Sequence, residues 1–416
     1  MRATMPAEQT GLGEAITEKL LELAAVSDES GLLTRLYLSP AHRRAADLVA
    51  KWMREAGMTT RLDALGNVVG RYKAREGVPL TLMLGSHIDT VRNAGRFDGA
   101  LGVVTAIEVV KAASASGKRF PFAVEVIAFG DEEGVRFAST LGGAKALAGR
   151  FDTKTLDEVG EDGVSRRRAL VTFGSNPARV SEEALSPDRS AGYVEVHIEQ
   201  GPVLEKEGLP VGIVTAIDGV TRGTVEVGGV AGHAGTVPMT MRHDALAAAA
   251  EMLLAIEDRA RARPTLVATV GKMEVPASAA NTIPGQVRFS LDIRSPSDQE
   301  RTSALGDIKE KIASIAQGRG VSARLTIGHE APAALCDARL SDQLAQAVEG
   351  CGIAPRRLPS GAGHDAMAFD KVIPFAMLFV RCRGGVSHNP DEYACPADID
   401  VAARVLSAFL DKVASP

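Results

Sequence analysis

Residues 80–103 read LTLMLGSHIDTVRNAGRFDGALGV, and this stretch decides the fold class. It begins with a mostly apolar run, as expected of a strand buried inside a sheet. A short loop follows that carries His87, Asp89 and Asp98 among several glycines. Small and branched residues then predict a helix from about Gly99 to Ser116. A buried strand that leads through a polar loop into a helix is typical of an α/β fold.

The residues on either side of this stretch extend the same pattern. Helices are predicted at residues 14–26, 30–37 and 39–55, and strands at 59–62, 67–72 and 122–130. Ser39 and Pro40 mark the start of the third helix, because serine caps helix N-termini and proline suits the first turn. Apolar strands that alternate with helices predict a mixed, mostly parallel sheet covered by helices.

From about residue 218 the pattern changes to that of a second, smaller domain. Strands are predicted at residues 224–230, 265–274, 286–294 and 322–328, and helices at 244–262 and 297–318. This β-α-β-β-α-β order fits a ferredoxin-like α+β domain. A buried strand at 373–379 and a helix at 396–413 then return to the first pattern. We therefore predict a catalytic domain of residues 1–217 and 333–416, interrupted by an inserted domain at 218–332.

Composition excludes several classes of partner. The chain has 416 residues, 45% hydrophobic residues and a formal net charge of −5, so nothing in it favours nucleic acid as a partner. No apolar run approaches the 18 or more residues of a membrane span. The first residues lack the apolar core of a secretory signal. Four widely spaced cysteines predict reduced thiols, so we expect a cytoplasmic protein.

Histidines and acids are concentrated in loops, where metal ligands are expected. Of the eight histidines, those in loops beside glycines and carboxylates are His87, His197, His233, His364 and His388. The sequence DEE at residues 131–133 follows another predicted strand. Ligands in open α/β sheets bind beyond the carboxyl ends of the strands. Imidazole and carboxylate together suit zinc, manganese, cobalt or nickel.

The two aspartates of the first loop are expected to have different roles in such a metal centre. Two ions held side by side need a bridging carboxylate. Asp89, two residues from His87, is placed to accept a hydrogen bond from the imidazole and orient it. Asp98 lies just ahead of the predicted helix and can approach from another direction, so we expect Asp98 to be the bridge. A single histidine in such a loop is more often structural or exposed than a ligand, and it is the combination with the acids at residues 131–133 that favours a metal site.

Eight short motifs, in this order, resemble the M20-type metal amidohydrolases. The similarity is to the hydantoinase/carbamoylase branch, which contains N-carbamoyl-L-amino acid hydrolases, allantoate amidohydrolases and β-ureidopropionases. The motifs are GSHIDTVRNAGRFDGALGV, FGDEEGVRF, EVHIEQGPVLE, GVAGHAGTVPM, NTIPG, LDIRS, SGAGHDA and SHNPDEY. They extend from about residue 85 to residue 395, which is most of the chain.

The resemblance implies a set of metal ligands and a general base. The implied ligands of two divalent ions are His87, Asp98, Glu133, His197 and His388, with Asp98 as the bridge. Glu132 is implied as the base that takes a proton from the attacking water and passes it to the leaving amine. Many relatives outside this branch carry an acid where His197 stands, so HIEQG is the carbamoylase-like form.

The resemblance also implies contacts to the substrate. His233 would stabilise the oxyanion and would come from the partner subunit of a homodimer. Arg294 would bind the substrate carboxylate, with Asn281 and Gln200 as further polar contacts. Gly361 and Ala362 lie in a glycine-rich turn that would either let the backbone approach a ligand or only form a tight turn. The inserted domain is thus expected to serve in dimerisation and as a lid.

The resemblance implies a hydrolase of N-carbamoyl-L-amino acids that yields the L-amino acid, CO2 and ammonia. Allantoate or 3-ureidopropionate hydrolysis, and then N-acyl-amino acid or dipeptide hydrolysis, are the alternatives within the same chemistry. A metal-stabilised scaffold or binding protein without turnover is the alternative from another class. His364 and Asp365 are expected to have supporting or structural roles.

Overall fold

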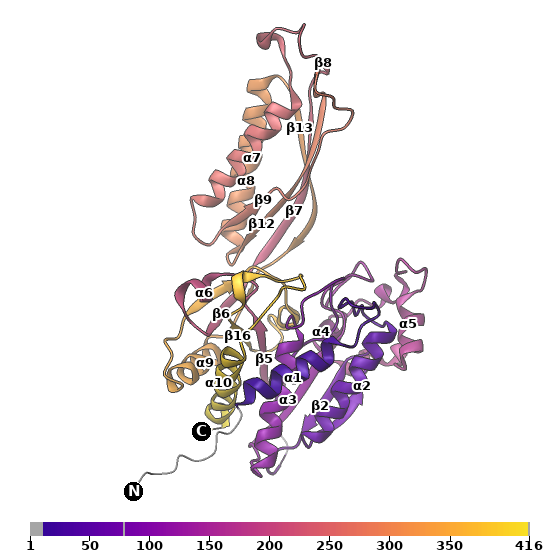
Figure 1. Ribbon diagram of the computed structural model, residues 1–416, viewed down its shortest axis with the longest axis vertical. Coiled ribbons are helices and arrows are strands. Elements are labelled where there is room, and N and C mark those ends of the chain that lie inside the picture. Colours follow the sequence, from indigo (N-terminus) through magenta and orange to yellow (C-terminus); the bar gives the residue numbers. More distant parts are fainter. Residues whose placement is uncertain (1–10, 78–79, 415–416) are drawn as a thin grey trace. The chain divides into compact units, whose positions relative to one another are not determined.

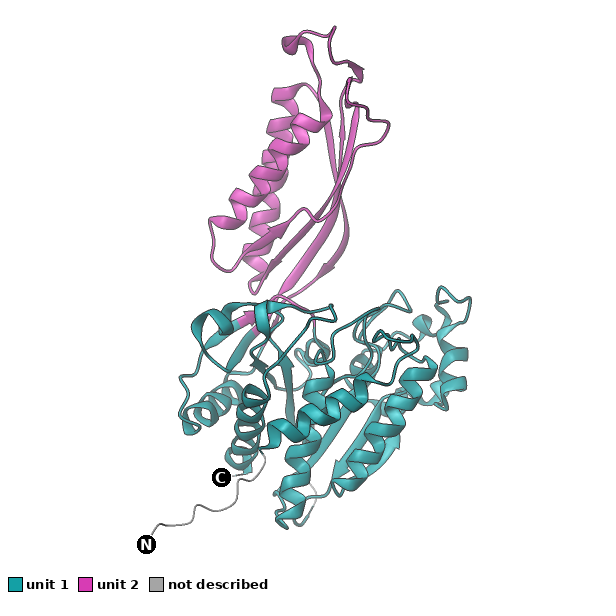
Figure 2. Ribbon diagram, viewed as in Figure 1, with its two compact units in different colours: residues 1–215, 336–358, 364–416 teal, residues 216–335, 359–363 magenta. Residues whose placement is uncertain are grey.

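The computed structural model describes residues 11–77 and 80–414, which divide into two compact units (Figure 2). Unit 1 contains the chain up to Thr215, then residues 336–358 and 364–416. Unit 2 contains residues 216–335 and 359–363. Among the described residues, no helix is both long and apolar enough to cross a bilayer.

A nine-stranded sheet, whose central strands lie in unit 1, has the order β1-β2-β4-β3-β5-β16-β6-β14, with β15 beside β6. The strands are β1 (Thr59–Leu62), β2 (Val68–Tyr72), β3 (Thr81–His87), β4 (Ala123–Phe129), β5 (Ser190–Ile198), β6 (Val211–Ile217), β14 (Ala334–Leu335), β15 (Arg357–Ser360) and β16 (Phe375–Val380). The adjacent strands β4, β3, β5 and β16 are parallel. Antiparallel pairs join β1, β2 and β4 at one edge and β16, β6 and β14 at the other.

The sheet is therefore mixed, as predicted, but only its centre is parallel, so the prediction of a mostly parallel sheet was wrong at the edges. For β1 and β2 the physical reason is the length of their connection. Residues 63–67 join β1 to β2 as a short hairpin, and a hairpin can only join antiparallel strands, whereas parallel neighbours need a long crossover.

Helices cover this sheet (Figure 1). The helices of unit 1 are α1 (Leu12–Ala24), α2 (Pro40–Glu55), α3 (Ala100–Ala115), α4 (Gly142–Leu147), α5 (Arg166–Phe173), α6 (Val203–Glu207), α9 (Ala338–Gly350) and α10 (Pro396–Ala414). One layer consists of α2, α3, α1, α10 and α9, in which neighbouring helices contact one another, and α2, α3, α9 and α10 also contact strands of the sheet. As predicted, Ser39 caps α2, where its Oγ accepts a hydrogen bond from the amide of His42 at 3.1 Å.

The helix predicted at residues 30–37 is wrong, because this segment is irregular. Its conformation is fixed instead by the buried side chain of Arg35. The guanidinium donates to the carbonyl of Ile88 at 2.6 Å and to those of Leu23 and Val26 at 2.9 and 3.0 Å. These bonds tie the segment to the loop that follows β3, and a regular helix would not supply them.

Unit 2 has the predicted β-α-β-β-α-β order. It contains β7 (Gly219–Gly228), α7 (Ala245–Arg261), β9 (Val267–Thr269), β10 (Met273–Glu274), β12 (Gln286–Ser295), α8 (Asp298–Arg319) and β13 (Ser322–Ala331), with a ribbon of β8 (Gly232–His233) and β11 (Thr282–Ile283). The sheet is antiparallel, in the order β10-β12-β7-β13 with β9 also beside β12. The single strand predicted at 265–274 is broken into β9 and β10. Alternate residues of β12 are buried under α7 and α8, as in a sheet covered on one face.

Candidate metal centre

The predicted ligands meet at the carboxyl ends of the central parallel strands. His87 is the last residue of β3, and His197 lies near the end of β5. Asp98 lies in the loop between β3 and α3, and Glu132 and Glu133 follow β4. His388 lies in the loop after β16. Parallel neighbours present their carboxyl ends at one sheet edge, which is why segments far apart in sequence deliver side chains to one place.

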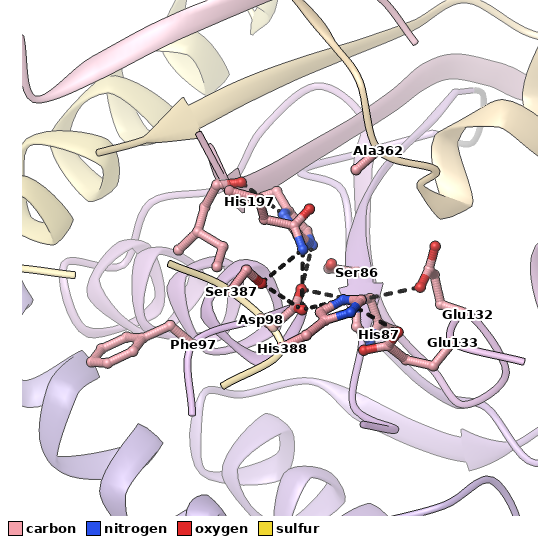
Figure 3. Close-up of polar contacts among 12 residues, drawn as sticks. Ser86, His87, Phe97, Asp98, Glu132, Glu133, His197, Ala362, Ser387 and His388 are labelled. Atoms are coloured by element: carbon pink, nitrogen blue, oxygen red, sulfur yellow. Dashed lines mark hydrogen bonds and ion pairs between the residues drawn. The ribbon is translucent and has the colours of Figure 1, made fainter. Parts of the chain in front are cut away.

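Asp98 is the centre of this cluster (Figure 3). Its carboxylate is buried, with 5% of the residue exposed. Oδ1 lies 3.2 Å from Nε2 of His197 and 3.6 Å from Nε2 of His87. Oδ2 lies 3.2 Å from Nε2 of His388. The two oxygens of one carboxylate therefore face different histidines.

Two groups of side chains share Asp98, and each could hold a cation. In the first, the ligand atoms of His87, Asp98 and His197 lie within 4.8 Å of one another. In the second, the same holds for Asp98, Glu133 and His388. These donors are imidazole nitrogens and carboxylate oxygens, the set that suits zinc, manganese, cobalt or nickel. The residues present thus fit two divalent ions that share one carboxylate.

The electrostatics of the cluster favour positive charge around Asp98. Burial would raise the pKa of Asp98, but hydrogen bonds from His197, His388 and His87 outweigh burial and hold that pKa well below its usual value. Burial would lower the pKa of His197, but the hydrogen bond to Asp98 raises it overall. The surroundings of Asp98 therefore favour the ionised form of its carboxylate.

Asp89 contacts the centre through different atoms from those predicted. Nδ1 of His87 lies 3.0 Å from the main-chain carbonyl of Asp89 and 3.6 Å from its carboxylate. The carboxylate instead accepts hydrogen bonds from the amides of Glu132 and Glu133, both at 3.2 Å. Asp89 thus orients His87 mainly with its backbone, while its side chain fixes the turn that carries the two glutamates. Sequence spacing gave no signal of this second contact.

Glu132 lies beside the ligand groups. Its side chain is 14% exposed, and Oε2 is 3.9 Å from Nε2 of His87. Burial raises its pKa well above the usual value, His87 opposes this shift, and the nearby Glu133 adds to it. Its position beside the candidate ligands places its carboxylate within reach of a group held there.

A buried ion pair supports the turn behind Glu132. Nη1 of Arg166 donates to Oδ2 of Asp131 at 2.8 Å, and both side chains are almost fully buried. The second guanidinium nitrogen donates to Ser139 and to Glu158. Burial raises the pKa of Asp131 to about 7, although Arg166 opposes that shift.

Replacing Arg166 with methionine is expected to destabilise the protein by about 3–5 kcal/mol, because it leaves a buried carboxylate without its partner. Arg167 is the matched control, since it lies next on the same helix and pairs with Asp157, with side chains 48% and 72% exposed. Arg167→Met should cost less than about 1 kcal/mol. Chemical denaturation of both variants measures the difference, and equal stabilities would contradict the importance of the buried pair.

Gln200, predicted as a substrate contact, lies within the metal-ligand cluster. Its side-chain amide donates to Oδ2 of Asp98 at 3.2 Å and to Oγ of Ser387 at 2.9 Å. Its backbone has a φ of 55°, a left-handed conformation that is uncommon for a residue other than glycine. The side chain of Gln200 is therefore hydrogen-bonded to the candidate ligand Asp98.

The remaining predicted contacts lie in unit 2, at opposite ends of its sheet. His233 is exposed on β8, and Asn281 lies beside it, because its carbonyl accepts the amide of Ala234 at 2.9 Å. Arg294 lies near the end of β12, opposite Val220 of β7. Its guanidinium binds both oxygens of Asp292 at 2.8 and 2.9 Å and the carbonyl of Gly361 at 2.5 Å.

Ala362 lies next to this second group, in a turn closed by Ser360. The amide of Ala362 donates to Oγ of Ser360 at 3.2 Å. Unit 2 therefore brings Arg294, Gly361 and Ala362 together, and separately His233 and Asn281, but it does not bring the two sets together.

Two further buried residues, His364 and Glu195, lie close to the candidate ligand His197. The ring of His364 meets that of His197 edge to face, with centroids 4.5 Å apart. Glu195 accepts hydrogen bonds from Ser86 at 2.8 Å, the Tyr193 hydroxyl at 3.2 Å and the amide of Ala366 at 3.1 Å. Sequence analysis missed Glu195. The alternation of β5 places it on the same side as His197, and this was the signal that could have identified it.

Comparisons with known proteins identify the family of the chain. Residues 83–412 match the peptidase family M20/M25/M40. The chain is 42% identical to allantoate deiminase 1 of Glycine max, over 97% of this chain and 90% of that protein. It is 40% identical to an N-carbamoyl-L-amino acid amidohydrolase of Geobacillus stearothermophilus, over 95% of this chain and 97% of that protein. A crystal structure of a hydantoinase/carbamoylase family amidase from Burkholderia multivorans matches with a TM-score of 0.92 and 32% identity, covering 97% of this chain and 98% of that chain.

These matches extend over nearly the whole chain, so they include the loops of the metal-ligand cluster as well as the sheets. They confirm the family resemblance inferred from the eight motifs. The chain belongs to the peptidase family M20/M25/M40 and is an amidohydrolase related to the hydantoinase/carbamoylase amidases.

Proposed function

We propose that the protein is a binuclear metal hydrolase that cleaves the ureido C–N bond of N-carbamoyl-L-amino acids. The products would be the L-amino acid, CO2 and ammonia. The observation that carries this proposal is the placement of Asp98, whose two oxygens face two groups of candidate ligands. A shared carboxylate of this kind is what a two-ion hydrolase requires. The names of the relatives supply the substrate class.

Two divalent ions, zinc, manganese, cobalt or nickel, are the proposed cofactors. Asp98 would help hold one ion together with His87 and His197, and the other together with Glu133 and His388. When bound, such ions lower the pKa of water and polarise the carbonyl of a substrate. The carbonyl of Asp89 contributes by fixing the ring of His87, so that Nε2 faces the cluster.

Glu132 is the proposed general base. Its carboxylate lies beside the ligand groups, where it takes a proton from the attacking water as the new C–O bond forms at the ureido carbon. It then gives this proton to the amino nitrogen of the leaving amino acid as the C–N bond breaks. The other product, carbamic acid, breaks down to CO2 and ammonia. Asp89 keeps Glu132 in place by accepting its amide hydrogen bond.

Arg294 is the proposed ligand of the substrate carboxylate. A guanidinium can bind a carboxylate with two parallel hydrogen bonds. Asp292 and the carbonyl of Gly361 already fix its orientation, so little side-chain freedom would be lost on binding. Ala362, with its small side chain, would let the backbone of this turn approach the substrate. Gln200 would reach the substrate only by giving up its bonds to Asp98 and Ser387.

His233 and Asn281 are proposed to act on the substrate of a second copy of the chain. His233 follows the end of β7, whereas Arg294 pairs with Val220 near its start. β7 has 10 residues, and strands rise about 3.3 Å per residue. A small substrate held by Arg294 therefore cannot also contact His233 of the same chain. A homodimer in which unit 2 completes the partner's site removes this conflict, and closure of unit 2 as a lid would assemble it.

Allantoate is the second candidate substrate. The relative with 42% identity is named allantoate deiminase, and the relative with 40% identity is named for N-carbamoyl-L-amino acids. Both substrates combine a ureido group with a carboxylate. The proposed metal ligands, Glu132 and Arg294 would therefore make the same contacts with either of them. What separates them is the remainder of the molecule beside the reacting group.

A substrate panel tests the proposal. Ammonia release is measured for N-carbamoyl-L-amino acids, allantoate, 3-ureidopropionate and N-acetyl-L-amino acids, with protein loaded separately with manganese, cobalt, nickel or zinc. We expect the highest kcat/KM for an N-carbamoyl-L-amino acid, and amino acid release in step with ammonia. A higher kcat/KM for allantoate would favour the second candidate. Turnover of N-acetyl-L-amino acids alone, followed by release of the free amino acid, would contradict both.

A further inference from the structure

Glu392 is a buried acid that lies outside both groups of candidate ligands, in the motif SHNPDEY. Only 3% of the residue is exposed. Its Oε1 accepts hydrogen bonds from two successive amides, those of Phe97 at 2.8 Å and Asp98 at 3.0 Å. Its Oε2 accepts a hydrogen bond from Oγ of Ser387 at 3.0 Å. One carboxylate thus joins the loop that carries Asp98 to the loop that carries His388.

Ser387 continues this connection to the carboxylate of Asp98. Its Oγ lies 3.2 Å from Oδ2 of Asp98 and accepts a hydrogen bond from the amide of Gln200 at 2.9 Å. Gln200 itself donates to the same Oδ2 at 3.2 Å. The oxygen of Asp98 that faces His388 is therefore also contacted by Ser387, from the same loop as His388, and by Gln200, from the loop after β5. Glu392 accepts hydrogen bonds from the Asp98 amide and from the Ser387 hydroxyl.

The backbone around these residues needs such support. His388 has a φ of 54° and Gln200 a φ of 55°, in the left-handed region that costs energy for residues other than glycine. The fit is close on the side of Glu392 as well. A Cβ atom added to Gly95 would lie 2.3 Å from the Glu392 carboxylate. Residue 95 therefore has no space for a side chain while Glu392 occupies this position.

From these contacts we infer that Glu392 is a positioning residue, which holds the Asp98 and His388 loops in register so that the ligand atoms of the second metal group converge. The inference rests on the proposed function and deepens it, because it assigns the support of one of the two ion sites. Glu392 acts through Asp98, Ser387 and the backbone, and it is not proposed to contact substrate or metal. Residues that support metal ligands in this way typically change metal affinity by about 10–100-fold when they are removed.

The decisive experiment compares Glu392→Ala with Glu392→Gln by two measurements. Zinc affinity is measured by competition with a chromophoric chelator, and amide hydrogen exchange is measured on metal-free protein. Alanine removes the acceptor, so zinc affinity at one of the two sites should fall by about 10–100-fold, and the amides of Phe97 and Asp98 should exchange faster. Glutamine keeps an oxygen acceptor for both amides, so it should restore slow exchange and an affinity close to that of the wild type.

Two controls separate positioning from a general loss of stability. Asp244→Ala removes a carboxylate that also accepts two successive amides, those of Leu246 and Ala247, at the start of α7 in unit 2. It should leave zinc affinity unchanged. Within the Glu392 variants, the amides of Val203 and Leu204, which donate to the two carboxylate oxygens of Glu199, should keep their exchange rates.

The outcomes distinguish this inference from the proposed function. The inference alone would be overturned if the wild type binds zinc at two sites and Glu392→Ala has the same zinc affinity and the same amide exchange rates as the wild type. Wild-type protein that binds no zinc would contradict the proposed function and the inference with it. If Glu392→Ala does not fold, Ser387→Ala tests the side-chain part of the connection, since it breaks the link between Glu392 and Oδ2 of Asp98 while both amide hydrogen bonds to Glu392 remain. It should weaken zinc binding at one site, and an unchanged affinity would count against the inference.

Discussion

Replacing Glu132 with glutamine is expected to lower kcat by about 10²–10⁴-fold while the fold and the metal content stay unchanged. Glutamine has nearly the same shape, but it cannot take a proton from the attacking water or return one to the leaving nitrogen. The amide of residue 132 would still donate to Asp89, so the turn after β4 should keep its conformation. The loss should appear in kcat more than in KM, because Glu132 is not proposed to bind substrate.

Steady-state kinetics with the preferred substrate, together with metal analysis of the same preparation, measures this effect. Glu161→Gln is the matched control, because it makes the same chemical change at an acid that is 83% exposed and pairs only with Arg92 among the described residues. Its kcat should equal that of the wild type. Near-normal turnover in Glu132→Gln would remove Glu132 from the proposed mechanism, whereas a loss of metal would show that Glu132 is a ligand instead.

The central part of the fold could be predicted from sequence because burial and periodicity are local signals. β3 is buried on both faces, so its residues form an apolar run, and α3 follows at the predicted position. The same argument placed Asp98 ahead of α3, where it could approach the cluster from a different direction from that of His87. The motifs predicted the other candidate ligands, and the structure brings all of these residues to one end of the sheet.

The parts that were missed depend on contacts between distant segments. The segment 30–37 has a helical pattern, but Arg35 holds it to the carbonyl of Ile88, more than fifty residues away. Glu392 accepts a hydrogen bond from the amide of Asp98, which is almost 300 residues away in the sequence. Sequence spacing carries no information about such pairs. The resemblance that assigned Gln200 to the substrate likewise could not reveal its bonds to Asp98 and Ser387.

The second large effect is expected for Asp98→Ala, which should abolish binding of both ions. Asp98 is the only residue common to the two ligand groups that face its two oxygens. Removing it takes one ligand from each ion and leaves two cations close together without the carboxylate that offsets their repulsion. His388→Ala should instead affect one group only, because the group of His87, Asp98 and His197 remains complete.

The metal content of these variants after saturation and removal of excess ion is the most direct test of the shared centre. The account predicts two ions per chain in the wild type, about one in His388→Ala and none in Asp98→Ala, following the two-ion geometry. A wild type that holds a single ion, or an Asp98→Ala variant that keeps as much metal as His388→Ala, would contradict a centre built around Asp98.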